Sequence, residues 1–60
     1  MSTLAELAAY LEARKAAQDT ERRRLSRAAD EHKRKRIKAT IDRLQHEIDS
    51  IKKDMERLHG

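Results

Sequence analysis

The fold is decided by the stretch IKATIDRLQHEIDSIKKDMERL, which covers residues 37–58. Its apolar residues alternate in spacing between four and three positions, the heptad pattern of a helix that packs against another helix. This apolar seam consists of Ile37, Ile41, Leu44, Ile48, Ile51, Met55 and Leu58. Each such side chain contributes roughly 1.5–3 kcal/mol when it is buried. We therefore predict that residues 37–60 are a coiled-coil oligomerisation segment, with Gly60 ending its helix.

The composition of the chain indicates an all-α protein. There is no Pro, and the only Gly is the last of the 60 residues, so turn-forming residues are nearly absent. Good helix formers such as Ala, Leu, Glu, Lys and Arg dominate instead. We predict a short N-terminal amphipathic helix followed by a long helix that ends in the three-heptad coiled coil.

A chain this short needs help to stabilise its fold. Small domains usually rely on disulfides, metals or oligomerisation, and this chain contains no Cys. A homo-oligomer is therefore expected, with a dimer favoured. Because Ile and Leu both occur at the d positions, the number of strands and their parallel or antiparallel direction stay open.

The N-terminal segment, residues 1–18, predicts a helix with a narrow apolar stripe. Thr3 and Glu6 have the spacing of a capping box, in which each side chain binds the other residue's backbone N–H. The stripe consists of Leu4, Leu7 and Leu11. Arg14 and Gln18 continue the same face, so the stripe ends after about two turns.

Residues 18–21 are the only break that the sequence suggests. Asp19 or Thr20 could cap a second helix, which would give a bend or a hairpin at this point. The alternative is that one helix simply continues through these residues, since nothing in them forbids it.

Residues 22–38 are a basic helical segment. Nine Lys or Arg residues stand against two acids, Asp30 and Glu31, which gives a local formal charge of +7. Asp30 with Arg34 and Glu31 with Lys35 are spaced as helix-supporting ion pairs. The nine cations are Arg22, Arg23, Arg24, Arg27, Lys33, Arg34, Lys35, Arg36 and Lys38.

This charge suggests two kinds of partner. A basic helix beside a pairing segment is typical of proteins that contact nucleic-acid phosphates, so these nine residues are candidate contacts to a DNA or RNA backbone. The alternative is a helical inhibitor, adaptor or assembly component that docks on an acidic surface of a larger protein complex. In that case the stripe Leu4, Leu7 and Leu11 would supply part of the docking surface.

Two resemblances accompany these alternatives. A basic helix followed directly by heptads resembles the basic-zipper proteins, and Ser26-Arg27 precedes Ile37 at the spacing of that family. The sequence departs from the family at Asp19, where a base-reading Asn is expected, and at Arg22-Arg23, where two Ala are expected. The sequence pattern of residues 41–48 resembles the coiled coil of the small inhibitors of the mitochondrial rotary ATPase. The aromatic residues of their inhibitory helix have no counterpart in this chain. We assign the chain to neither family.

Several function classes are not expected. The histidines, at positions 32, 46 and 59, are too far apart along a helix for an ordinary metal site, and no Gly-rich loop is present to hold phosphate. We therefore expect no enzyme activity, no cofactor and no metal.

No apolar run approaches the roughly 18 residues of a membrane span, and the N-terminus lacks the features of a signal peptide. A soluble, cytoplasmic protein without a membrane partner is expected.

Overall fold

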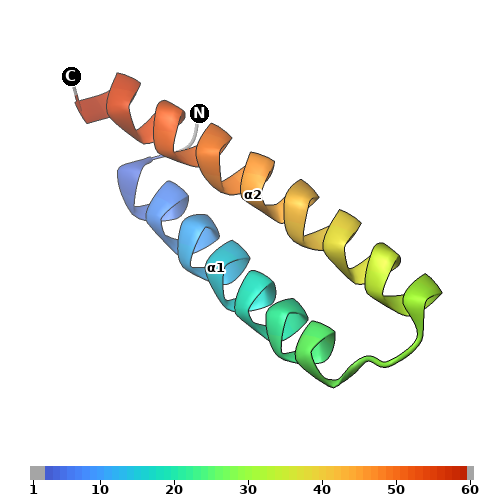
Figure 1. The fold of residues 1–60 in the computed structure, drawn as a ribbon. Helices are drawn as coiled ribbons and strands as arrows, with labels where there is room; N and C mark the ends of the chain where they lie inside the picture. The colour runs from blue at the N-terminus through green and yellow to red at the C-terminus, as the bar shows by residue number, and fades with distance from the viewer. Residues whose placement is uncertain (1–2, 60) are drawn as a thin grey trace.

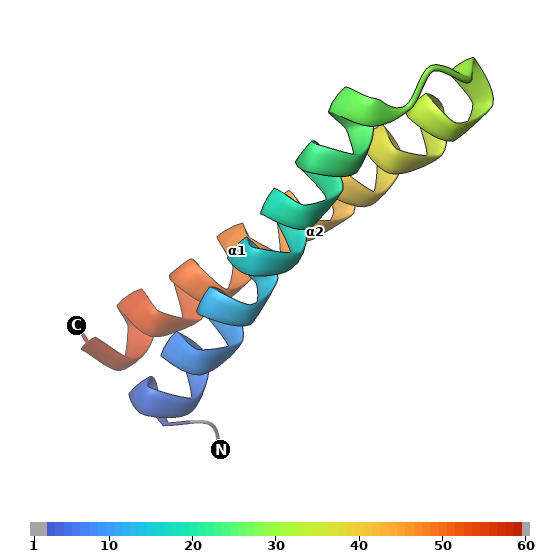
Figure 2. The same ribbon diagram turned by 90° about the horizontal axis from the view of Figure 1, so that it is seen from below.

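The computed structural model describes residues 3–59 and shows an antiparallel hairpin of two helices. Helix α1 covers Leu4–Arg27 and helix α2 covers Glu31–His59. The two helices lie side by side, with both chain ends at one end of the hairpin and the connection at the other (Figures 1 and 2). The hairpin measures 44 × 15 × 14 Å. The expected all-α class is confirmed, and no strand occurs among the described residues.

The start of α1 has the capping box that the sequence predicts. The Thr3 Oγ1 atom accepts a hydrogen bond from the Glu6 backbone N–H at 3.1 Å, and the Glu6 Oε1 atom accepts one from the Thr3 backbone N–H at 3.3 Å. Two N–H groups that the first turn would leave unpaired are thereby satisfied. The predicted end at Gly60 lies outside the described residues.

The chain reverses direction at residues 28–30, a break that the sequence analysis did not identify. Residues 18–21 lie inside α1, so of the two alternatives at this point the continuing helix is confirmed and the bend or hairpin is wrong. The reversal divides the predicted basic helical segment between the two helices. Asp30 directly precedes α2 and caps its first turn, because its Oδ2 atom accepts a hydrogen bond from the Lys33 backbone N–H at 3.3 Å. An acidic side chain is a favourable cap at this positive end of a helix.

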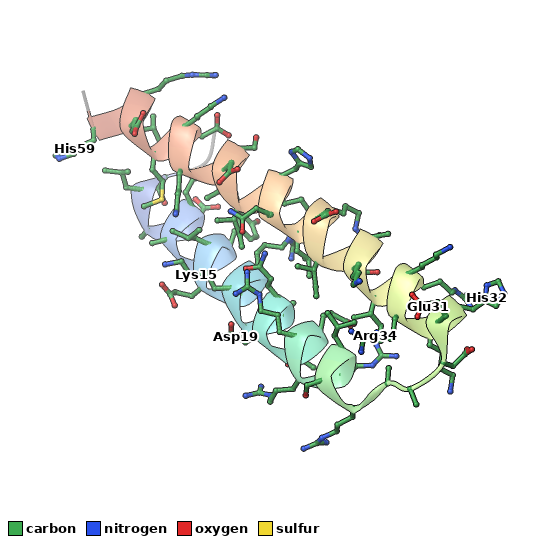
Figure 3. The ribbon with its side chains drawn as sticks, viewed as in Figure 1. Lys15, Asp19, Glu31, His32, Arg34 and His59 are labelled. Atoms are coloured by element: carbon green, nitrogen blue, oxygen red, sulfur yellow. The ribbon has the colours of Figure 1, made fainter. Side chains whose placement is uncertain are left out.

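Arg34 closes the connection between the helices. Its Nη1 atom donates to the carbonyl oxygens of Leu25 and Ala28, each at 3.0 Å. These carbonyls belong to the C-terminal end of α1, where backbone acceptors lack helical partners. Arg34 points back towards α1 (Figure 3), and the expected Asp30–Arg34 ion pair is replaced by this capping contact.

The core lies along the line where the two helices meet. Leu7 of α1 and Ile37, Leu44 and Ile48 of α2 are buried, with Ile48 the most enclosed at 3% exposure. Ile41, Ile51 and Met55 are half-buried, and Leu58 is exposed. Within this chain the seam therefore packs against α1 along residues 37–55, and Leu58 stays largely exposed.

The facing side of α1 continues in polar residues beyond Leu11. Gln18 is buried at 7% exposure, and its Nε2 atom donates to Gln45 Oε1 at 2.9 Å and to the Ile41 carbonyl at 3.4 Å. One turn away, Arg14 Nε pairs with Glu47 Oε2 at 2.9 Å. Leu7, Leu11, Arg14 and Gln18 share the three-and-four spacing of a helix seam. The stripe therefore does not end at Leu11 but changes from apolar to polar.

Candidate nucleic-acid interface

The reversal of the chain brings the nine predicted cations together at one end of the hairpin. We call this end, which comprises residues 22–38, the basic end. Four of them come from the last turns of α1 and five from the first turns of α2. Eight of the nine are exposed, and Arg34 is half-buried. Two segments that are separate in sequence thus present one positively charged surface.

The cations of the basic end are not equivalent. Arg24 is held by Glu21, with its Nη1 atom at 2.9 and 3.1 Å from the two carboxylate oxygens. Arg34 is engaged by the carbonyls of α1. The other seven side chains form no ion pair within the described residues. These seven cations are free to contact an anion from outside: Arg22, Arg23, Arg27, Lys33, Lys35, Arg36 and Lys38.

One side of the basic end is hollowed between the helices. This open hollow of about 370 Å³ is lined by Glu21, Arg24, Lys33, Arg36, Ile37 and Thr40. Three of these residues are cations, so the hollow suits an anionic group, although Glu21 offsets part of that charge. The charge count did not single out Thr40. Its spacing from Arg36 and Ile37 could have placed it there, because residues three and four apart share a helix face.

The predicted docking stripe is only partly open. Leu4 is 41% exposed and Leu11 is half-buried, whereas Leu7 is buried against α2. Leu4 and Leu11 line a second open hollow of about 660 Å³ together with Met55 of α2. The full lining of this region, which we call the terminal surface, is Leu4, Ala5, Ala8, Leu11, Lys52, Met55, Glu56 and His59.

The histidines are dispersed along the hairpin. All three are exposed, and His32 and His59 lie at opposite ends (Figure 3). Within residues 3–59, no group of three or more His, Cys, Asp or Glu side chains could hold a metal ion. Neither described helix is long and apolar enough to cross a membrane.

Comparisons of this chain with protein-family models, curated proteins and solved structures find no match.

Proposed function

We propose that this protein binds the phosphate backbone of DNA or RNA through its basic end. The observation that carries the proposal is the gathering of eight exposed cations from both helices at the reversal of the chain. Each phosphate contacted releases condensed counterions, so a cluster of this size supports binding without any reading of bases.

The shape of the hairpin favours contacts with the backbone over contacts with base edges. The major groove of duplex DNA is about 12 Å wide and admits a single helix. The hairpin is 15 × 14 Å across, so its two paired helices do not fit into the groove together. The chain has one aromatic residue, Tyr10, which lies outside the basic end, so stacking on unpaired bases has no platform there.

A salt titration tests the proposal. Binding to a short DNA duplex and to a structured RNA is measured at roughly 50 to 200 mM salt, where several phosphate contacts change affinity by orders of magnitude. We expect similar affinity for duplexes of unrelated sequence and a steep loss of binding as salt rises. Absence of binding at the lowest salt, or affinity that does not depend on salt, contradicts the proposal.

The terminal surface favours a second candidate, docking on an acidic surface of a larger protein. Part of its apolar surface stays open beside the interhelical core, and nucleic-acid binding gives that open part no role. Replacing Leu4 and Leu11 with Ser discriminates the two candidates, because Leu4 is exposed and Leu11 is only half-buried. Nucleic-acid affinity should survive this change, whereas binding to a protein partner should fall. A pull-down with and without nuclease shows which class of partner is retained.

The proposal includes an assembly mode and a location. The two helices are proposed to pack as an antiparallel coiled coil, which is supported by the three-and-four spacing on both facing sides. Two hairpins are proposed to associate as a homodimer, since four buried apolar residues within residues 3–59 make a small core. The cytoplasm is the proposed location because nucleic acid is accessible there.

A further inference from the structure

The terminal surface is an open, mainly apolar hollow that no other residue in the range 3–59 fills. Leu4, Ala5, Ala8 and Leu11 contribute one side of it from α1, and Met55 contributes from α2. Leu7 faces α2 and is buried, whereas Leu4 and Ala5 are exposed and the other three residues are only half-buried, so part of this apolar surface stays open beside the core. Ala5 and Ala8 are small, which lets another helix approach closely, since the distance between packed helices depends on the side chains at the contact.

The charges on the rim of this surface are self-complementary. Lys52 and Glu56 lie one turn apart on α2, both are exposed, and neither forms an ion pair within the described residues. In a symmetric dimer the same surface meets itself, and residue i contacts residue j in both directions. When two α2 helices cross antiparallel at the level of residue 54, Lys52 of each copy meets Glu56 of the other. A parallel arrangement would place Lys52 against Lys52 and Glu56 against Glu56.

The distribution of charge along the hairpin favours the same direction. The basic end carries nine cations and two acids, a local formal charge of +7, and lies at the opposite end from the terminal surface (Figure 1). A parallel dimer would bring two basic ends together, with strong mutual repulsion. An antiparallel dimer separates them by much more than the ~8 Å screening length of physiological salt.

We propose that a second copy of this chain covers the terminal surface, with the two hairpins antiparallel and overlapping only in their terminal halves. The overlap is a four-helix arrangement, and the two basic ends point in opposite directions. At a rise of about 1.5 Å per helical residue, the two chain reversals are roughly 70 Å apart. This inference rests on the dimer included in the proposed function and is independent of nucleic-acid binding, so mass measurements and binding titrations can fail separately.

The first test is the mass of the full chain in solution, measured by analytical ultracentrifugation over a range of protein concentrations. We expect a dimer that dissociates on dilution. The variant Ala8→Glu places a charge in the terminal surface and should give a monomer. Ala13→Glu is the matched control, because Ala13 is exposed and does not line the terminal surface. Circular dichroism confirms that both variants keep their helices. A wild-type chain that is monomeric throughout, or an Ala8→Glu dimer as strong as the control, overturns the proposal.

The second test exchanges the rim charges. Lys52→Glu and Glu56→Lys each replace two attractive contacts with repulsive ones, and should weaken the dimer by roughly tenfold on the energies of exposed pairs. The double variant restores complementarity and should recover most of the affinity. A double variant no stronger than either single variant contradicts the antiparallel pairing.

The third test measures the direction of the helices. The chain has no Cys, so Ala29→Cys carries a single spin label in the connection between the helices. The proposed dimer places two such labels roughly 70 Å apart on the helical rise given above. A short label separation identifies a parallel dimer and overturns the proposal.

Discussion

The two ends of the hairpin differ in what closes them and in what they expose. At the basic end a short connection joins the helices, Arg34 binds the carbonyls of α1, and the exposed side chains are mainly cationic. At the other end no chain connection holds the helices together, and Leu4 and Leu58 are 41% and 49% exposed. One pair of helices therefore presents a charged surface and an apolar surface. Because the two helices pack against each other along their length, the two ends of the hairpin can expose different surfaces and so bind different partners.

The largest contrast in stability should appear between Ile37, buried at the basic end, and Leu58, exposed at the other. Ile37→Ala removes a side chain that is 7% exposed and should lower the free energy of unfolding by about 2–5 kcal/mol. Leu58→Ala should cost less than about 1 kcal/mol on the burial scale, since much of its surface remains in water. Urea denaturation followed by circular dichroism measures both. Equal losses would mean that the seam does not pack as described.

The next effect concerns the closure of the basic end. Arg34→Ala removes both hydrogen bonds to the Leu25 and Ala28 carbonyls and should lower the free energy of unfolding by roughly 1–3 kcal/mol. Arg36→Ala is the control, because Arg36 is exposed and its side chain forms no hydrogen bond or ion pair here. Thermal unfolding measures the melting temperature of both variants. A similar melting temperature for the two would contradict the role of Arg34 in capping the end of α1.

A smaller effect is expected at Gln18, the buried polar residue between the two ends. Gln18→Leu removes its hydrogen bonds to Gln45 and Ile41 but fills the site with an apolar side chain. The exchange removes only one partner of each bond and leaves Gln45 Oε1 without this donor. Because Gln45 is half-buried, we expect a loss of about 1 kcal/mol, the low end of the cost of an unpaired buried group. Gln18→Ala, which leaves a space as well, should be the less stable of the two. If Gln18→Leu unfolds the hairpin, the hydrogen bonds of Gln18 contribute more to its stability than expected.

The smallest effect should come from the Arg14–Glu47 ion pair. Its side chains are 44% and 42% exposed, so water screens the interaction. A double-mutant cycle with Arg14→Gln and Glu47→Gln should give a coupling of about 0.2–1 kcal/mol, diminishing as salt is added. A coupling that is large and insensitive to salt would show a drier contact than this exposure implies.

The sequence predicts much of the fold, but not how the helices pair. The seam of residues 37–58 and the capping box of Thr3 and Glu6 follow from spacing alone, because both are local patterns. The partner of the seam does not follow from the sequence, because the polar residues Arg14 and Gln18 interrupt the apolar stripe of α1. Their polar atoms pair across the interface instead, with Glu47 and Gln45, which only the folded arrangement reveals.

The sequence also does not predict the position of the chain reversal or the contacts that individual cations make. No Gly or Pro marks residues 28–30, and the cap at Asp30 could be mistaken for one member of a helical ion pair. The charge count identified the basic end but could not show that Arg24 binds Glu21 or that Arg34 binds carbonyls. Those contacts join side chains to groups whose positions depend on the fold.

Contact between the basic end and nucleic-acid phosphates is tested most directly by comparing how two charge-matched variants bind duplex DNA. The first replaces Arg22, Arg23 and Lys35 of the basic end with Gln, and the second replaces Arg43, Lys53 and Arg57 outside it. All six residues are exposed, so both proteins lose three positive charges and should keep their helices. If the basic end contacts phosphates, the first variant should bind more weakly, with the slope of log affinity against log salt reduced by about 2.7. The second should retain a slope near that of the wild type. Equal loss in both variants would show that net charge alone governs binding, and would contradict a phosphate-binding surface at the basic end.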